Sequence, residues 1–525
     1  MLLDQKILNK LNEIGIALSK ERNISALLEK ILLYAKEVTK ADGGTIYTVT
    51  SDKKLHFAIA VSDSLNFHAG GTSNIPVPFS DLSLVLEDGS LNDSLMVAYA
   101  VNHKKSINIK NAYDEQGFDF SGTRGFDERT GYRTEAVLTV PMKNHEDEVI
   151  AVLQLINPIA YKTFSEDDQK LAESLASQAG VALTNQYLIE SLRGLFESLI
   201  HVIAEAIDEK SSSTANHGKR VPIVALLLAK AVDAMEEGPF HALHFSEEEL
   251  YELEVAAFLH DCGKITTPIH IVEKQHKLET IFDRIELVNA RYDALLEKCE
   301  KELYQKKLQV LEKLSPQAFE LAKQEFATLE RDYQEKIDVY ASDREFIARC
   351  NEGKEIMTAA AQDRLKGIAR MHDVKEHPFL TPDELENLSV EKGNLTAKER
   401  EIIKHHVVMT YRMLKQLHFP KELRRVPEIA ASHHERVDGK GYPRGLKKEQ
   451  MSVQARILAI ADVFEALSAP DRPYKEALSL SQVLQIMTQM VEEGHLDKDL
   501  FEVFVKKKAY LPYAQKFLSP EQMDI

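Results

Sequence analysis

Two adjacent histidines, His433 and His434, come directly before a loop that contains Gly439, Gly441 and Gly445. Apolar residues precede the pair at helical spacing, which predicts a short helix that delivers both imidazoles to the loop. Adjacent helical residues point about 100° apart, so each histidine can serve a different metal ion. Glycines let the loop backbone approach a ligand closely. The stretch predicts a metal site that opens onto a ligand loop; a surface histidine pair before a turn is the alternative interpretation.

Other candidate ligands lie on apolar helices. His260 and Asp261 follow a wholly apolar turn, and an imidazole beside a carboxylate can bind one metal ion or bridge two. His406 lies on the apolar stripe of a helix that we expect to begin with a capping box between Thr396 and Glu399. Buried polar groups at such positions need partners, and metal ions can supply them.

An apolar helix expected over residues 455–467 is interrupted by Asp462. A carboxylate among isoleucine, alanine and valine side chains needs a partner, which a metal ion again supplies. Lys264 follows Asp261 by three residues and is placed to meet a phosphate group. The residue types therefore predict a metal centre that acts on a phosphate ester.

Composition narrows the class of protein. With 525 residues, 44% apolar and 28% charged, the chain is expected to form three or four soluble units. The formal charge of −18 argues against a nucleic-acid polymer as partner, because such partners require a basic face. The most apolar run, residues 221–235, is too short for a membrane span and contains Lys230 and Asp233. The three cysteines form no C-x-x-C pair, so a reducing, cytoplasmic location is expected.

Pattern changes divide the chain. Residues 1–164 alternate helix and strand signals, which predicts an α/β domain on an antiparallel sheet, with a helix over residues 5–39. Residues 165–208 lack proline and predict a connecting helix that pairs with its copy in a parallel homodimer; packing on its own domain is the alternative. The expected seam is Ala182, Ile189, Leu192, Phe196, Leu199 and Ile203. Residues 273–392 predict a helical hairpin or coiled coil.

The first part of the chain resembles the GAF domains of cyclic-nucleotide phosphodiesterases and cyclases. The resemblance rests on residues 125–134, 138–141 and 152–157. It implies a sensory domain that either binds an effector or serves only dimerisation. These GAF domains often carry an Asn-Lys, Phe and Asp-Glu signature, of which this chain lacks the Lys and the Glu. The corresponding positions are Asn157-Pro158, Phe164 and Asp168-Gln169. The GAF ligand therefore stays unknown.

The His-Asp pair, the His-His pair and the Gly441-Tyr442-Pro443 loop together resemble the HD-GYP family. This is the metal-dependent subgroup of HD phosphohydrolases that hydrolyses the bacterial messenger cyclic di-GMP. The resemblance implies an all-α domain over residues 195–272 and 393–525. By this resemblance the metal ligands are His217, His260, Asp261, His406, His433, His434 and Asp462. Asp261 would bridge two ions.

The same resemblance implies roles in catalysis and substrate binding. Asp261 and Lys264 would be catalytic. The implied substrate contacts are Lys264, Gly441, Tyr442, Pro443, Arg444, Arg472 and Lys475. The stretch from Asp462 to Arg472 is one residue longer than is usual in the family, through Ala469-Pro470, which leaves the placement of Arg472 open.

Two further departures concern metal number and regulation. Some family members bind a third metal through a Glu four residues before the first histidine, where this chain has Ser213. Two ions are therefore expected. The insertion at residues 273–392 is not part of the common domain. It could gate the pocket or transmit rearrangements from the GAF domain, or it could be an arm for a protein partner.

The expected chemistry follows from the donor set. Five imidazoles and two carboxylates suit iron or manganese, and also zinc, better than calcium or magnesium. Two such ions about 3.5–4 Å apart promote in-line attack of water on a phosphodiester. The expected function is hydrolysis of cyclic di-GMP to linear pGpG under control of the GAF domain, with further hydrolysis to GMP left open. The alternatives are hydrolysis of another cyclic dinucleotide, or a catalytically silent module that binds the messenger or a protein.

Overall fold

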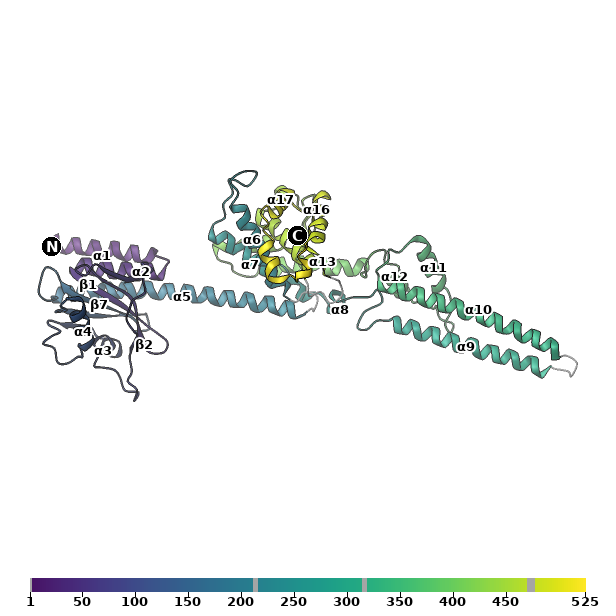
Figure 1. Cartoon of the computed structure of the whole chain (residues 1–525), viewed down its shortest axis with the longest axis horizontal. Helices are drawn as coiled ribbons and strands as arrows, with labels where there is room; N and C mark the ends of the chain where they lie inside the picture. The colour runs from purple at the N-terminus through teal and green to yellow at the C-terminus, as the bar shows by residue number, and fades with distance from the viewer. Residues whose placement is uncertain (1, 211–215, 314–318, 470–476) are drawn as a thin grey trace. The chain divides into compact units, whose positions relative to one another are not determined.

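The computed structural model describes residues 2–210, 216–313, 319–469 and 477–525, with side chains from residue 10 onward. The chain forms two compact units, Met1–Phe196 and Glu197–Ile525 (Figure 1). The predictions for Ser213, Arg472 and Lys475 lie outside the described residues. Within the described part, no helix combines the length and the apolar character that crossing a membrane would require.

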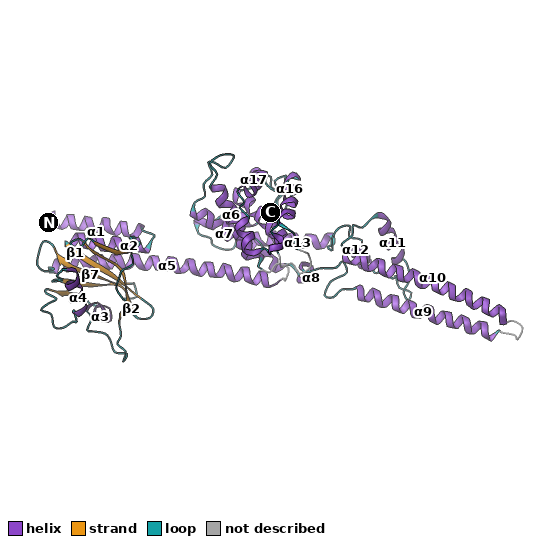
Figure 2. Ribbon diagram, in the orientation of Figure 1, coloured by secondary structure: helices purple, strands orange, loops and turns teal. Residues whose placement is uncertain are grey.

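The first unit is built on one antiparallel sheet, as predicted (Figure 2). Its strand order is β3-β2-β1-β7-β6-β5, and β4 pairs with β2. The strands are β1 (Ala41–Val49), β2 (Lys54–Ser62), β3 (Phe67–Gly70), β4 (Leu82–Ser83), β5 (Ile107–Ile109), β6 (Val137–Lys143) and β7 (Val149–Pro158). The helices are α1 (Leu2–Lys20), α2 (Ile24–Thr39), α3 (Met96–His103), α4 (Ser121–Thr130) and the first part of α5 (Glu166–Lys210).

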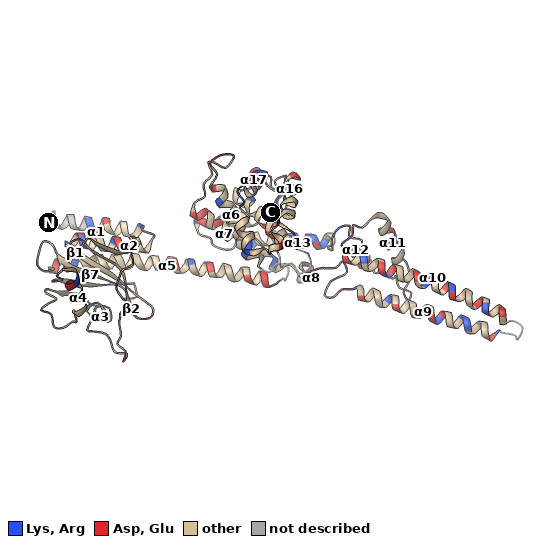
Figure 3. Cartoon of the chain, viewed as in Figure 1, with Lys and Arg blue, Asp and Glu red and all other residues tan. Residues whose placement is uncertain are grey.

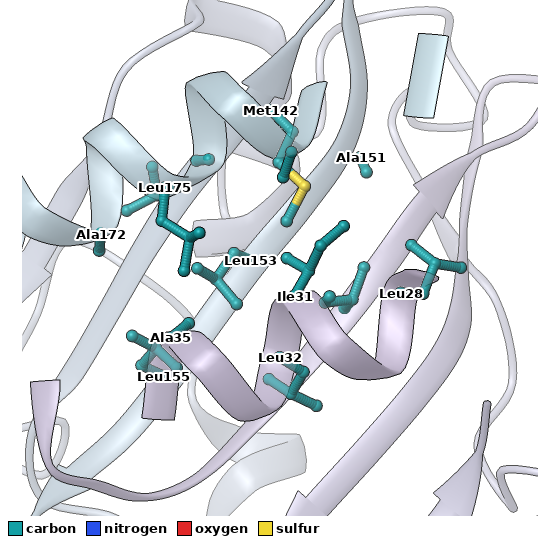
Figure 4. Close-up of a cluster of buried hydrophobic side chains, with 14 of the residues drawn as sticks. Leu28, Ile31, Leu32, Ala35, Met142, Ala151, Leu153, Leu155, Ala172 and Leu175 are labelled. Carbon is teal, nitrogen blue, oxygen red and sulfur yellow. The ribbon is translucent and has the colours of Figure 1, made fainter. Parts of the chain in front are cut away.

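The main core of this unit lies between the sheet, α2 and the start of α5 (Figure 4). Ile31 and Leu32 of α2 and Leu175 of α5 pack among strand residues such as Leu153. The single helix expected over residues 5–39 is divided, because Asn23 accepts a hydrogen bond from the Ala26 amide and starts α2 as a separate helix.

The predicted connecting helix is present as α5, but its exposed apolar stripe differs from the predicted seam. Ala182 belongs to the buried core of the first unit, so it is not available to a partner. Ile189, Leu192 and Leu199 are exposed, as the seam requires. Leu188, Leu195 and Val202 are exposed as well, so an apolar stripe also runs through Leu188, Leu192, Leu195, Leu199 and Val202. These positions keep the heptad spacing of a coiled coil.

The second unit is helical in its described residues. The part that carries the predicted ligands contains α6 (His217–Asp233), α7 (Glu247–Leu259), η2 (Cys262–Thr266), α8 (Ile269–Val272), α13 (Ala397–Leu414), η3 (Lys421–Leu423), α14 (Val426–Ala430), η4 (Lys448–Gln450) and α15 (Val453–Ser468). The C-terminal elements are α16 (Leu480–Glu492), α17 (Lys498–Lys506), α18 (Leu511–Phe517) and η5 (Pro520–Gln522). The predicted capping box between Thr396 and Glu399 is confirmed at the start of α13.

The inserted helices are α9 (Ile285–Glu312), α10 (Phe319–Glu352), α11 (Ala359–Ala369) and α12 (Pro382–Leu388). Contacts of Arg344 with Asp293 and of Lys307 with Glu330 show that α9 and α10 run antiparallel. Both helices carry charges of both signs along their length (Figure 3). The base has its own apolar core, around Tyr292, and the predicted helical hairpin is therefore present.

Candidate metal centre

Five elements of the second unit deliver the seven predicted ligands to one place. His217 is the first residue of α6, and His260 and Asp261 follow the end of α7. His406 lies within α13, and His433 and His434 follow α14. Asp462 lies in the middle of α15. Six of the seven are buried and His434 is half-buried, so the centre lies at the meeting point of helices rather than on an exposed loop.

Three of these residues form a first site together with one oxygen of Asp261. The Nε2 atom of His217 lies 3.2 Å from Asp462 Oδ1 and 3.6 Å from Asp261 Oδ2. The Nε2 atom of His260 lies 3.2 Å from the same Asp261 oxygen. We call the group of His217, His260, Asp462 and Asp261 Oδ2 the first site.

The other oxygen of Asp261 faces the remaining histidines. Asp261 Oδ1 lies 3.2 Å from Nε2 of His406 and 3.8 Å from Nε2 of His433. His406, His433 and His434 bring their ligand atoms within 4.8 Å of one another. We call His406, His433, His434 and Asp261 Oδ1 the second site. Asp261 therefore stands between two donor groups, which is the position predicted for a bridging ligand.

The ring orientations leave the metal-binding nitrogens available. In His260, His406 and His433 the Nδ1 atom lies 2.6–2.7 Å from the backbone oxygen three residues earlier. A hydrogen bond to that carbonyl requires the proton on Nδ1 and leaves Nε2 as an acceptor. Among the described residues, these three Nε2 atoms and Asp261 Oδ1 are buried without a hydrogen-bond partner. Buried polar atoms rarely stay unsatisfied, so the donor set fits metal ions.

The protonation states of Asp261, His433 and His434 favour the same use. Burial raises the pKa of Asp261, but the charges of Lys264 and His260 outweigh it and hold that pKa well below its usual range. Burial and the neighbouring His434 hold the pKa of His433 well below its usual range. Burial lowers the pKa of His434 to about 4. Near neutral pH the carboxylate is ionised and these imidazoles are neutral, which are the forms that bind metals.

Glu465 completes the first site, and sequence reasoning overlooked it. Its carboxylate is buried beside His217, with Oε2 at 2.5 Å from His217 Nδ1. Burial lowers the pKa of His217, but hydrogen bonds to Asp462 and Glu465 raise it to about 10. Glu465 thus orients the ring and directs Nε2 at the site. The sequence could have identified Glu465 by its spacing, because it follows Asp462 by three residues on an apolar helix and so lies on the same face.

Lys264 lies at the edge of the first site. Its Nζ atom is 2.6 Å from Asp261 Oδ2, and the side chain is 22% exposed. The turn that carries it packs tightly on α13, because a Cβ atom at Gly263 would lie 1.9 Å from the backbone oxygen of His406. Only glycine fits there, so the His-Asp turn and the His406 helix hold a fixed distance.

The Gly-Tyr-Pro loop borders the second site. The Tyr442 ring packs on His434, with 4.9 Å between ring centroids. The buried Glu435 carboxylate accepts hydrogen bonds from the Arg444 and Leu446 amides and so holds the loop. We expected glycine to allow close approach to a ligand; instead a Cβ at Gly441 would meet the chain's own backbone, 2.3 Å from the Arg436 nitrogen.

Pro443 and Arg444 were also predicted to contact substrate, and the structure supports these two contacts less directly. Pro443 is exposed beside Tyr442. The guanidinium of Arg444 contacts Glu428 and the Ser432 hydroxyl, so in this structure its charge is already paired. Contacts of these residues with substrate remain predictions.

A second cavity lies in the first unit. Its volume is about 540 Å³, a size typical of small-molecule sites. Phe57, Phe79 and Phe126 form one aromatic wall, with neighbouring centroids 5.2 and 5.8 Å apart. Polar groups also line it, among them Gln154, whose Oε1 accepts a hydrogen bond from the Tyr47 hydroxyl at 3.0 Å.

Comparison with known proteins bears on both units. Residues 23–183 match the GAF domain family, and residues 379–500 match the HD domain family. A 3'3'-cGAMP-specific phosphodiesterase of Vibrio cholerae is 40% identical over 26% of this chain and 30% of that protein. A cyclic di-GMP phosphodiesterase of Pseudomonas aeruginosa is 35% identical over 28% and 34%. One from Thermotoga maritima is 36% identical over 26% and 35%.

The chain therefore spans about a third of the length of these relatives. The antiparallel α/β unit and the helical unit agree with the two family matches. The chain carries a GAF domain at residues 23–183 and an HD domain at residues 379–500.

Proposed function

We propose that this chain is a metal-dependent phosphodiesterase of the HD-GYP subgroup that hydrolyses cyclic di-GMP to linear pGpG. One observation carries the proposal: the two oxygens of Asp261 face two groups of donors, among which the Nε2 atoms of His260, His406 and His433 are buried without a hydrogen-bond partner in the described part of the chain. Relatives named cyclic di-GMP phosphodiesterases support the substrate class.

Two divalent ions, iron or manganese in our proposal, would supply activation of water and neutralisation of charge on the phosphate. Asp261, held ionised by Lys264 and the neighbouring imidazoles, would set their separation. Lys264, beside the bridging carboxylate, would donate hydrogen bonds to a phosphoryl oxygen as negative charge develops. Tyr442 stays protonated because burial raises its pKa, so it would bind substrate as a hydrogen-bond donor.

The GAF domain would regulate this site by binding a small molecule in its aromatic-walled cavity. The exposed heptad stripe of α5 supports a parallel homodimer through that helix and the GAF domain. We place the enzyme in the cytoplasm, where the messenger is made and degraded.

A second candidate substrate is 3'3'-cGAMP, because the relative at 40% identity carries that specificity in its name. A catalytically silent module is disfavoured by the complete set of seven ligands. With Ser213 in place of a third-metal carboxylate, the product should be the linear dinucleotide, with GMP slow to appear.

The test is turnover of cyclic di-GMP and 3'3'-cGAMP, in separate and competing reactions, by protein purified anaerobically and analysed for metal. We expect pGpG formation that disappears on chelation and returns with Mn²⁺ or Fe²⁺. If the protein hydrolyses neither dinucleotide when both sites hold metal, the proposed phosphodiesterase activity is refuted. Preference for 3'3'-cGAMP would move the assignment to the second substrate.

A further inference from the structure

The last turn of α5 holds the turn that follows the His-Asp pair. Lys210 Nζ donates hydrogen bonds to the backbone oxygens of Lys264 at 3.0 Å, Ile265 at 2.5 Å and Thr267 at 2.7 Å. Carbonyls at the end of a helical turn lack partners within that turn, and an ammonium group offers three donors. The Lys264 oxygen also accepts the Thr267 amide at 3.0 Å, so Lys210 adds a charged donor to that carbonyl and to those of Ile265 and Thr267, which favours this conformation of η2 over others.

This turn bears directly on the first site. The Lys264 amide donates to the Asp261 carbonyl at 2.9 Å, and its ammonium contacts Asp261 Oδ2 at 2.6 Å. The three hydrogen bonds of the Lys210 ammonium go to backbone oxygens and not to the side chain of a candidate ligand. Lys210 acts through the backbone that sets where Lys264 and Asp261 lie.

The same turn of α5 also contacts the other end of the first site. Asp208 Oδ1 accepts a hydrogen bond from the Gly218 amide at 3.2 Å, directly after the ligand His217. A Cβ at Gly218 would lie 3.3 Å from that oxygen, so the approach is close. Asp208 lines a small cavity together with His217, Asp261 and Lys264. Two residues of α5, two positions apart, thus hold the segments that supply His217 and Asp261.

We infer that Asp208 and Lys210 are positioning residues of the first site, and that the last turn of α5 is where this helix acts on the metal centre. The second site, on α13 and after α14, receives no contact from either side chain among the described residues. Withdrawal or rotation of this turn would break both contacts together and weaken the first site before the second.

Through α5, a change in the GAF domain could alter the metal centre. The start of α5 belongs to the core of the first unit through Ala172, Leu175 and Ala179, and the helix continues without a break to Lys210. A change at one end of a continuous helix can bias the other end if the contacts there have two states. This regulatory consequence rests on the proposed function, whereas the positioning role does not.

The test is titration of full-length apoprotein with Co²⁺, followed by visible absorption, in which each site gives its own step. Lys210→Met should weaken binding at the first site by about 10- to 100-fold, the usual cost of losing an outer partner of a metal site, and weaken the second step less, because Asp261 is only one of the four groups there. Lys210→Arg, which keeps the donors, should restore most of the affinity. Glu209→Gln is the matched control, because Glu209 is exposed on the same turn.

Asp208→Ala provides an independent arm: it should weaken the same step, whereas Asp208→Asn, which keeps a carbonyl oxygen for the Gly218 amide, should not. Identical titrations for Lys210→Met and Glu209→Gln would overturn the inference, as would equal weakening of both steps. Wild-type protein that binds Co²⁺ in two steps but hydrolyses no cyclic dinucleotide would refute the proposed function alone.

Discussion

The candidate metal centre and the base of the insertion both bury ionisable side chains. At the base these side chains have partners within the protein, whereas at the candidate centre several of their polar atoms have none among the described residues. At the base, the Lys274 ammonium contacts both oxygens of Glu399 at 2.7 and 2.9 Å and Asn387 at 2.7 Å. Lys277 donates to the backbone oxygens of Leu388 and Val390. At the metal centre, the Nε2 atoms of three histidines have no hydrogen-bond partner among the described residues.

This difference separates a structural network from a ligand site. A buried charge is tolerated only when its partners are present, so the protein itself completes the network around Lys274. The histidine cluster is complete only when something else binds.

The largest effect is expected at the carboxylate shared by the two donor groups. Asp261→Ala should abolish turnover and lower bound metal at both sites, because each oxygen of Asp261 faces one site. Metal analysis and the turnover assay measure the two losses. Retained activity in this variant would remove the two-metal account, and loss of metal from one site alone would remove the bridging role.

At the base of the insertion, Lys274→Met should destabilise the protein without removing metal. Loss of one partner from a buried ion pair costs about 3–5 kcal/mol, because the other charge stays buried. Hydrogen exchange should therefore lose protection in α12 and at the start of α13, while metal content stays at the wild-type value.

The control for that variant is Lys298→Met in the same insertion. Lys298 and Glu376 form an exposed pair at 3.6 Å, so its loss should cost less than about 1 kcal/mol. Equal destabilisation by the two lysine variants would contradict the role of Lys274 in stabilising the base of the insertion. Metal loss in Lys274→Met would contradict its separation from the metal centre.

A smaller effect is expected at Glu465, which belongs to the metal centre but is partnered by the protein. Glu465→Gln keeps a hydrogen-bond acceptor beside His217 but removes the charge, so metal affinity at the first site should fall by about 10-fold. Titration with Mn²⁺ measures it, with the exposed Glu492→Gln as control. An unchanged affinity would show that Glu465 does not orient the ligand.

The smallest effect is expected in the outer part of the hairpin. Replacing residues 300–335 with a short Gly-Ser turn leaves the base core around Tyr292 and Phe346 intact. Turnover and metal content should then stay within about twofold, because the segment removed contains none of the centre's ligands. A larger change in basal turnover would favour the gating role of the insertion over a protein-interaction arm.

Part of the candidate ligand set could be proposed from local signals in the sequence, and the family resemblance supplied the rest. His260, Asp261 and Asp462 are polar residues within apolar helical segments, and each such residue requires a partner. The antiparallel sheet of the first unit was predictable for the same reason, since its strands have a clear apolar pattern.

What the sequence could not show depends on contacts between distant segments. Glu465 was overlooked because its partner, His217, lies 248 residues away. The predicted seam of α5 wrongly included Ala182, because the burial of that residue is decided by the core of the first unit, whereas Ile189, Leu192 and Leu199 of the seam are exposed. Gly263 is required because the backbone of His406, from a distant helix, lies against it, and no local pattern in the sequence shows that contact.

The central claim is that Asp261 joins two metal sites, and anomalous diffraction from crystals of the Mn²⁺- or Fe²⁺-loaded protein tests it most directly. The account predicts two anomalous peaks, one on each side of the Asp261 carboxylate, with His217, His260 and Asp462 around one and His406, His433 and His434 around the other. A single peak, or a third peak within the centre, would contradict it.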